Sequence, residues 1–183
     1  MDIRNLQADD QRSVEQAAAA LVAGFREHWP EAWPDLASAR AEVQAALEPG
    51  KICCAAYNSD GALLGWIGGG LQYAFVWELH PLVVLPAAQG HGIGRALVAD
   101  FEERVREQGG LTLLLGSDDD DDMTSLSSVD LYPDVWAHIT RIRNLRGHPY
   151  EFYQKCGFAI VGVVPDANGP GRPDILMAKR VGG

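Results

Sequence analysis

The feature that most constrains the fold is a strand, a glycine-rich turn, a helix and a second strand in succession between residues 77 and 115. An apolar run at residues 77–84, W-E-L-H-P-L-V-V, is followed by the turn Q-G-H-G-I-G at residues 89–94. Residues 111–115 form a continuous apolar run, typical of a strand covered on both faces. Between them, apolar residues recur every four positions and Gly109-Gly110 ends the pattern: Ile93, Leu97, Phe101 and Val105. This order predicts a parallel βαβ unit.

The residues before this unit predict an antiparallel meander. Residues 51–57 and 62–70 are apolar runs on either side of Asn-Ser-Asp-Gly, a turn composition, and residues 75–84 form the third strand. The triplet Gly68-Gly69-Gly70 is expected to weaken the end of the second strand. A meander joined to a parallel βαβ unit indicates the α/β class, with a mixed sheet of about six or seven strands and flanking helices.

Further elements are expected on both sides of this core. A first helix follows Asp9 and Asp10, and a second helix spans residues 38–47 with Ser38 as its N-cap. Later patterns predict a helix at 136–143, a helix opened by Pro149 and ended by Gly157, and strands at 158–165 and 175–180. Because 183 residues, 47% of them hydrophobic, suffice for one full core, we expect a single domain over residues 1–183.

Composition excludes several classes of function. The formal net charge of −10 argues against nucleic-acid binding, which requires clustered Lys and Arg. No apolar run approaches the roughly 20 residues that span a bilayer, and the first residues lack the pattern of a secretory signal. We therefore expect a cytoplasmic protein without membrane contact. The three cysteines, Cys53, Cys54 and Cys156, have neither disulfide nor metal-ligand spacing, so we expect buried thiols and no metal site.

Two segments leave alternatives open. The proline-containing loop with Trp29 and Trp33 either caps the core with its aromatic rings or lines a ligand site. Residues 118–122 are five consecutive aspartates. Such a run usually forms a solvated loop, because like charges repel and a core does not accept them. The alternative is an acidic site for a polycationic ligand.

Residues 77–94 carry the candidate chemistry. In a strand Glu78 and His80 point to the same side, so two groups able to carry a proton share one surface. Pro81 predicts a bulge, which leaves backbone groups at residues 82–84 for another partner, such as the extended amide chain of a pantetheine. The glycine turn directs backbone N–H groups and a helix N-terminus at an anion such as a pyrophosphate. The dinucleotide and Walker fingerprints both fail, the first because Leu97 replaces a third Gly or Ala.

A family resemblance follows from the order of these elements. The meander, Q-x-x-G-x-G at residues 89–94, the helix and strand after it, a late helix with tyrosine and a final strand pair resemble the Gcn5-related N-acetyltransferase (GNAT) superfamily over nearly the whole chain. The resemblance implies that the bulged strand holds the pantetheine of acetyl-CoA and that the motif holds its pyrophosphate. The residues that it assigns to acetyl-CoA are Leu82, Val83, Val84, Gln89, Gly90, His91, Gly92, Ile93, Gly94 and Arg95.

Six segments resemble the chromosomal type of aminoglycoside 6'-N-acetyltransferase more closely: residues 77–84, 116–119, 130–132, 144–158, 161–169 and 173–179. This resemblance implies that Glu78 and His80 lie beside the amine to be acetylated. It also places the Leu82 N–H at the thioester oxygen and Tyr153 near the sulfur. The residues expected to bind the aminoglycoside are Trp29, Tyr73, Glu78, Asp118 and Asp119. Because the acidic run is longer than the usual loop of this family, the contacting aspartate stays open.

The function expected from these residues is direct transfer of an acetyl group from acetyl-CoA to an aminoglycoside amine. Glu78, directly or through water and His80, would accept the proton of the amine, and Tyr153 would supply a proton to the departing thiolate. One alternative is a GNAT enzyme that acetylates a polyamine, a small metabolite amine or a protein lysine. Another is a CoA-binding sensor without catalysis. The resemblance also implies a homodimer.

Overall fold

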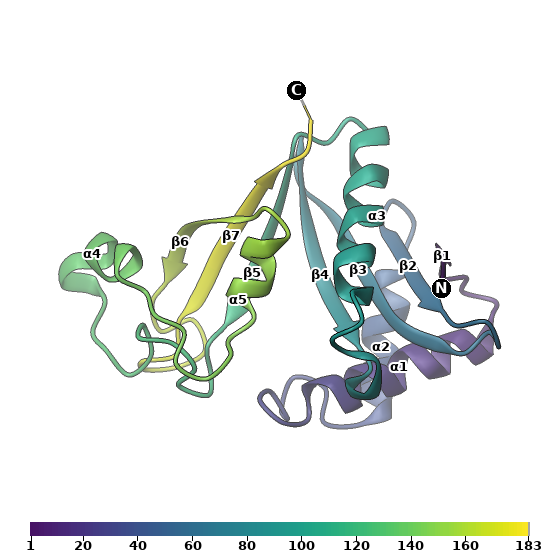
Figure 1. Ribbon diagram of the computed structural model, residues 1–183, viewed down its shortest axis with the longest axis horizontal. Coiled ribbons are helices and arrows are strands. Elements are labelled where there is room, and N and C mark those ends of the chain that lie inside the picture. The colour runs from purple at the N-terminus through teal and green to yellow at the C-terminus, as the bar shows by residue number, and fades with distance from the viewer. Residues whose placement is uncertain (183) are drawn as a thin grey trace. The chain divides into compact units, whose positions relative to one another are not determined.

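The computed structural model describes residues 1–182, which divide into two compact units. The first unit contains residues 1–113 and 181–182, and the second contains residues 114–180. The described residues form seven strands in the order β1-β2-β3-β4-β5-β7-β6, so the expected mixed sheet with flanking helices is confirmed (Figure 1). The single domain expected over residues 1–183 stays a prediction.

The first unit is an antiparallel meander with helices on both faces. Its strands are β1 (Asp2–Asn5), β2 (Ile52–Tyr57), β3 (Leu63–Tyr73) and β4 (Val76–Val84), each paired with the next. Its helices are α1 (Gln11–Phe25), α2 (Leu36–Ala46), the short 3₁₀ turn η1 (Pro86–Ala88) and α3 (Ile93–Glu107). The strand β5 (Thr112–Asp118) begins in this unit. The strands of the meander thus lie close to the predicted ranges, and the structure adds a strand that was not predicted, β1.

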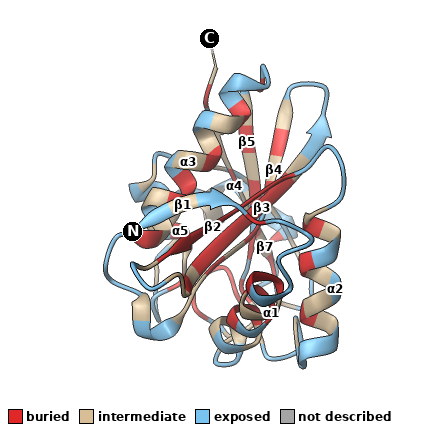
Figure 2. Ribbon diagram, turned by 90° about the vertical axis from the view of Figure 1, so that its right-hand side faces the viewer, coloured by how far each residue is buried: buried red, intermediate tan, exposed pale blue. Residues whose placement is uncertain are grey.

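Alternation along β2 shows which helices cover which face. Cys53 belongs to the buried cluster formed with α1 and α2, whereas the neighbouring Cys54 thiol lies beside Asp100 of α3. On the first face, the Trp66 indole N–H donates to the Ala17 carbonyl of α1 at 3.0 Å. Every residue of β2 is buried, and Figure 2 shows β2 and β3 as the red centre of the meander. The sheet is therefore covered on both sides at this point, which explains why β2 has no polar alternation.

The structure confirms the predicted N-terminal residues of α1 and corrects the predicted N-cap of α2. Asp10 caps α1, as the acidic residues before that helix indicate, by accepting the Ser13 N–H at 3.1 Å. The prediction that Ser38 caps α2 is wrong. Asp35 is the N-cap and accepts the Ser38 N–H at 2.8 Å, so Ser38 is the third helical residue of a capping box.

The glycine triplet does not weaken β3, which continues to Tyr73. A Cβ built on Gly69 would lie 2.2 Å from the Glu78 carbonyl oxygen and 2.4 Å from the Phe101 ring of α3. Glycine is therefore required here because α3 approaches the sheet closely. The triplet serves packing, and the expectation of a weak strand end was wrong for that reason.

The second unit is built on β5, β6 (Ala159–Val164) and β7 (Asp174–Arg180), with β7 paired antiparallel to β6. Its helical elements are η2 (Tyr132–Asp134), α4 (Val135–Thr140) and α5 (Tyr150–Lys155). The expected helix over residues 136–143 is thus shorter and begins one residue earlier. Pro149 is the N-cap of α5, and Gly157, with φ +92°, follows its end as predicted.

The predictions for cysteine burial hold for two residues of three. Cys53 and Cys54 are buried and Cys156 is half-buried. Burial raises the pKa of Cys53 to about 12, so its thiol stays protonated at neutral pH. Within residues 1–182 no helix has the length and apolar character needed to cross a membrane.

Candidate active site

Strand β4 is interrupted where the sequence indicates. Between the pairs Ile67–Leu82 and Gly69–Leu79, β3 contributes one intervening residue and β4 contributes two, His80 and Pro81. The predicted bulge is confirmed, and the His80–Pro81 peptide is cis. An extra residue on one strand leaves the ladder locally unpaired and turns the following side chains to the opposite face.

The side chains around the bulge show this change of face. Before it, Trp77 lies beside Val105 and Gly110, on the α3 side of the sheet. After it, Val83 packs against Gly24 of α1 on the other side, although simple alternation would put Trp77 and Val83 on one face. Trp77 and Leu79 are buried, whereas Glu78 is half-buried and His80 is exposed. His80 contacts α2, and alternation along the strand puts Glu78 on the same α1–α2 face, so the two residues share one side as predicted.

The backbone after the bulge has donors that point away from β3. The Leu85 N–H donates to the Leu64 carbonyl at 2.9 Å, which makes this a hydrogen-bonded antiparallel pair. Hydrogen-bonded and non-hydrogen-bonded pairs alternate, so Val83 is bonded to β3, whereas the N–H groups of Leu82 and Val84 point to the opposite edge. This orientation fits the expectation that these two residues offer backbone groups to an extended amide chain.

The glycine turn before α3 forms a cradle of backbone donors. Gly92 is the N-cap of α3 with φ +80°, and Gly90 has φ +77°, conformations that glycine adopts without a steric penalty. No side chain caps the helix, and nothing lies within 4 Å of a Cβ built on either glycine. The first N–H groups of a helix have no partner within it, so this N-terminus is open to an anion.

The remaining residues of the turn shape its entry. His91 is exposed, and its Nδ1 lies 2.8 Å from the Gln89 carbonyl oxygen. The Gln89 amide donates to the Val84 carbonyl at 3.2 Å, which ties the turn to the end of β4. Ile93 is buried, Gly94 is half-buried and Arg95 is exposed at the first turn of α3. The turn thus presents a basic side chain beside its free donors.

The tryptophan loop after α1 packs against itself and against β4. Phe25 of α1 contacts both rings, with centroid separations of 5.9 Å to Trp29 and 4.5 Å to Trp33. Trp33 in turn lies 6.0 Å from the His80 ring. The indole nitrogen of Trp29 is buried without a hydrogen-bond partner. The loop therefore caps the core, as one reading predicts, and also adjoins the residues expected to bind the acceptor.

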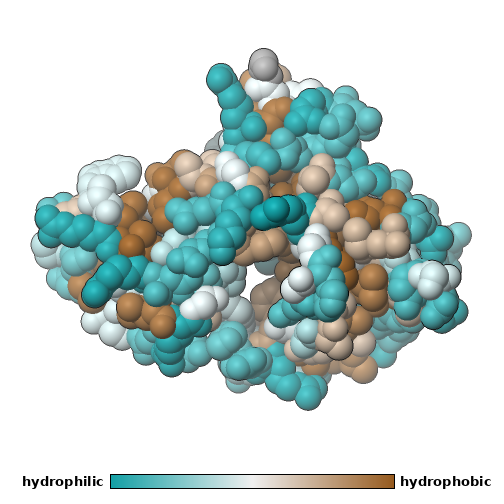
Figure 3. Space-filling model, viewed as in Figure 1, coloured by the Kyte–Doolittle hydropathy of each residue, from teal (hydrophilic) through white to brown (hydrophobic). Residues whose placement is uncertain are grey.

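Tyr73, another residue expected to bind substrate, lies at the exposed end of β3. It is 65% exposed, and the neighbouring Leu71 and Phe75 are exposed as well. Figure 3 shows hydrophilic residues over much of the viewed surface, with groups of hydrophobic residues between them. In the first unit the structure thus brings His80 next to the tryptophan loop, and it leaves Tyr73 at the strand end.

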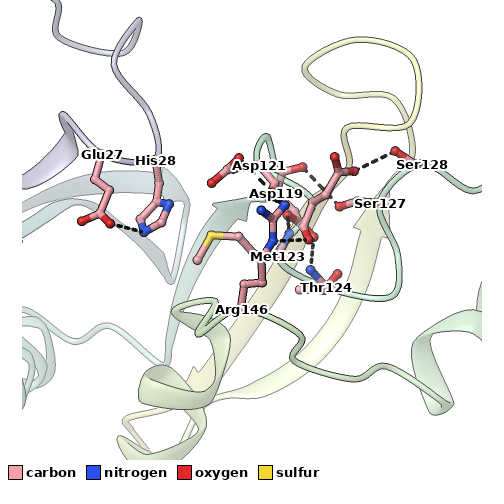
Figure 4. Close-up of polar contacts among 10 residues, drawn as sticks. Glu27, His28, Asp119, Asp121, Met123, Thr124, Ser127, Ser128 and Arg146 are labelled. Atoms are coloured by element: carbon pink, nitrogen blue, oxygen red, sulfur yellow. Dashed lines mark hydrogen bonds and ion pairs between the residues drawn. The ribbon is translucent and has the colours of Figure 1, made fainter.

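The acidic run in the second unit is more ordered than a solvated loop. Asp119 is completely buried, and its carboxylate accepts the N–H groups of Met123 at 2.7 Å and Thr124 at 2.8 Å (Figure 4). The Arg146 guanidinium donates to the carbonyls of Asp121 and Asp122. The expectation of a solvated run is wrong for Asp119, because two backbone donors compensate its burial. This burial also does not fit the expected contact between Asp119 and a substrate.

Asp118 is an exposed residue of the acidic run, and hydrogen bonds hold both its carboxylate and its backbone carbonyl. The Asn168 amide donates to its carboxylate at 2.6 Å. Its carbonyl accepts from Nε2 of the buried His148 at 3.0 Å, since His148 Nδ1 already accepts the Tyr150 N–H at 3.2 Å. Burial lowers the pKa of His148, so the imidazole is neutral at pH 7. Burial, followed by the charge of Asp118, raises the pKa of Asp120.

Tyr153, the expected proton donor, is half-buried in α5. Its ring lies 5.1 Å from Phe152 and 5.8 Å from Phe158. Desolvation raises the pKa of the Tyr153 hydroxyl, with a smaller effect from Cys156. The phenol therefore remains protonated at neutral pH, as a proton donor must.

Sequence reasoning missed three residues that the structure connects to these groups: Glu42, His148 and Asn168. Glu42 occupies the apolar stripe of α2 formed by Ala39, Val43 and Ala46, and a carboxylate in such a stripe was an available signal. His148 carried no signal beyond its position before a helix-opening proline, and Asn168 read as a turn residue. The contacts of these three residues join segments distant in the chain or depend on tertiary packing, which periodicity does not describe.

Other possible sites in the described residues do not involve the predicted groups. A cavity of about 330 Å³ lies between the ends of α2 and α3 and the start of β2, lined in part by Asn5, Lys51 and Arg104. None of the predicted site residues lines it. Across residues 1–182 no three His, Cys, Asp or Glu side chains are grouped to hold a metal ion.

The bulged strand, its outward N–H groups and the uncapped N-terminus of α3 fit an enzyme that binds an extended, phosphate-bearing acyl donor. The sequence matches the acetyltransferase (GNAT) family over residues 16–132. The chain belongs to this family.

Solved structures give a closer likeness. An aminoglycoside 6'-N-acetyltransferase complexed with coenzyme A is 41% identical with a TM-score of 0.90, and the aminoglycoside 6'-N-acetyltransferase from Enterococcus faecium is 42% identical with a TM-score of 0.87. An aminoglycoside 6'-acetyltransferase type Ii is 36% identical with a TM-score of 0.74. Each alignment covers 99% of this chain and 97% of the other. A comparison with curated protein sequences gave no match.

Proposed function

We propose that the protein is an acetyl-CoA-dependent aminoglycoside 6'-N-acetyltransferase that transfers the acetyl group directly to the amine. The observation that carries the proposal is the full-length likeness, at 41% and 42% identity, to enzymes of that activity. The residues present also fit acetyl-CoA, because the α3 N-terminus has no side-chain cap and two glycines with positive φ keep it open. In this proposal Gln89 to Arg95 bind the pyrophosphate, and Leu82, Val83 and Val84 bind the pantetheine.

Acetyl-CoA supplies the thioester carbon that the amine attacks, and the residues of the chain manage the protons and charge. An aminoglycoside ammonium must lose a proton before attack, and Glu78, directly or through water and His80, accepts it. The Leu82 N–H, which points away from β3, donates to the oxyanion. As the C–N bond forms and the C–S bond breaks, the protonated Tyr153 hydroxyl donates to the thiolate.

Acidic side chains supply the attraction for a polycationic acceptor. Asp118 has an exposed carboxylate held by Asn168, so we propose that it contacts an ammonium group of the substrate, with Asp119 supporting the loop from within. Trp29, Tyr73 and Glu78 complete the proposed acceptor site. A homodimer and a cytoplasmic location are part of the same proposal and rest on the family resemblance.

An acceptor screen tests this function. Purified protein is incubated with acetyl-CoA, and CoA release is measured with kanamycin, with an aminoglycoside that carries a 6'-hydroxyl in place of the 6'-amine, with spermidine and with a lysine peptide. We expect the highest kcat/KM for kanamycin and no transfer to the 6'-hydroxyl compound. A higher kcat/KM for spermidine or the peptide would favour the alternative acceptor classes. No CoA release with any amine would favour a CoA-binding sensor.

A further inference from the structure

Glu42 of α2 approaches the candidate proton acceptor His80 from a helix that the sequence did not connect to the site. Its Oε1 lies 3.7 Å from His80 Nε2. The Glu42 side chain is 26% exposed and that of His80 is 58% exposed. At this separation the contact is an ion pair and not a hydrogen bond, so it acts on His80 whenever the imidazole carries a proton.

Glu42 lies where a carboxylate has a desolvation cost. It lies in the stripe of α2 that buries Ala39, Val43 and Ala46, where an apolar residue would pack at no desolvation cost. Ion pairs as exposed as this one contribute little to stability. The stability of the fold therefore does not explain why a carboxylate stands here.

The two cationic side chains on α2 and just after it have other partners. Arg40, on the same helix, holds the Glu15 carboxylate with contacts of 2.8 and 2.9 Å, and Lys51 pairs with Glu48 at 3.1 Å. Among the described residues, His80 is the cationic partner found within 4.0 Å of Glu42. The Glu42 charge is thus directed at His80.

The His80 imidazole also contacts the tryptophan loop. Trp33 lies 6.0 Å from the His80 ring, and Phe25 fixes Trp33 through an edge contact at 4.5 Å. Because His80 is one of the two residues of the β4 bulge, its backbone is less constrained by the ladder than that of its neighbours. Contacts from the tryptophan loop and from α2 compensate for that freedom.

We propose that Glu42 is a positioning residue that orients the His80 imidazole and stabilises the imidazolium formed when His80 takes the proton of the acceptor amine. On the route through His80, the proton moves from the amine nitrogen to a ring nitrogen of His80 on its way to Glu78, and Glu42 remains ionised throughout. This arrangement matches the general logic in which a base is oriented by a third group. The inference rests on the proposed acetyltransferase function and adds a residue to it.

A double-mutant cycle tests the proposal. We expect E42Q to lower kcat for kanamycin about tenfold, a part of the roughly 10²–10⁴-fold that a general base contributes, while the KM for kanamycin changes less than about twofold. In an H80A background, E42Q should lower kcat by no more than about a further twofold, since its effect passes through His80. E42D, which keeps the charge, should recover part of the loss. E48Q is the matched control, because Glu48 pairs with Lys51 and should leave kcat unchanged.

Three results would overturn the proposal. A raised KM with unchanged kcat in E42Q would make Glu42 a substrate ligand. An equal loss of kcat in the wild-type and H80A backgrounds would make its effect independent of His80. A kcat and a KM equal to those of the wild type in E42Q would show that Glu42 has no role in catalysis. Thermal unfolding of each variant identifies losses that come from misfolding.

A crystal structure of E42Q without substrate separates this proposal from the proposed function. We expect the His80 ring to leave the position that it occupies beside Trp33. If wild-type protein acetylates no aminoglycoside but the ring still moves in E42Q, the positioning role stands and the proposed function fails. A ring that stays in place in E42Q contradicts the positioning role whatever the activity.

Discussion

The glycine turn before α3 and the aspartate loop after β5 treat their backbone donors in opposite ways. In the glycine turn no side chain caps α3, and two residues with positive φ keep the space around the N–H groups empty. In the aspartate loop the buried Asp119 carboxylate accepts the N–H groups of Met123 and Thr124. The first loop leaves its donors without a side-chain cap, and the second pairs its donors with its own carboxylate. A run of like charges can therefore contain a structural anchor.

Removal of the anchor should have the largest effect on stability. We expect D119A to lower the free energy of unfolding by about 3 kcal/mol or more, because it leaves two buried N–H groups without a partner. Urea denaturation measures this loss. The control D122N replaces an exposed residue with one that still accepts from the Ser128 hydroxyl, and it should stay within about 0.5 kcal/mol of wild type. A loss of less than about 1 kcal/mol in D119A would show that the loop does not depend on Asp119.

In the glycine turn, a substitution should affect ligand binding more than stability. Gly92 and Gly109 stand at the two ends of α3 with φ +80° and +77°, and neither would place a Cβ within 4 Å of another atom. G92A and G109A should each cost about 1 kcal/mol of stability through left-handed backbone strain. G92A alone should weaken CoA binding, by about tenfold in calorimetric titration. Equal CoA affinity in both variants would mean that the α3 N-terminus is not the pyrophosphate site.

The buried His148, which is bonded to the carbonyl of Asp118, should make the stability depend on pH. Burial lowers the pKa of His148, so below about pH 6.5 the unfolded chain binds a proton that the folded chain does not. Stability should then fall as the pH is lowered, by at most about 1.4 kcal/mol per pH unit from this group. H148Q, whose amide can make the same two hydrogen bonds, should reduce that fall. Denaturation curves between pH 5 and 8 decide, and identical slopes in wild type and H148Q would contradict the assignment.

The smallest effect is expected at the exposed end of the aspartate loop. D118N should raise the KM for kanamycin by about threefold and weaken its dependence on salt, because one screened charge contact is lost. The KM for acetyl-CoA should not change. Steady-state kinetics at low and high salt provide the measurement. If D118N leaves the kanamycin KM unchanged at low salt, the acidic loop does not bind the acceptor.

The sequence predicted the parts of the fold that depend on local pattern. The α3 helix, the hairpin and the bulge at Pro81 all follow from periodicity, glycine position and the missing proline donor. The errors have tertiary causes: Phe101 packing requires Gly69, and the buried Asp119 carboxylate accepts from the N–H groups of Met123 and Thr124. Glu42 shows the same limit, since its apolar stripe was visible in the sequence but its partner His80 is distant in the chain.

The site of acetylation tests the central claim most directly. The product formed from kanamycin and acetyl-CoA is isolated, and two-dimensional NMR locates the new amide. The account predicts a single acetyl group on the 6'-nitrogen. An acetyl group on any other nitrogen, or recovery of unmodified kanamycin, would contradict it.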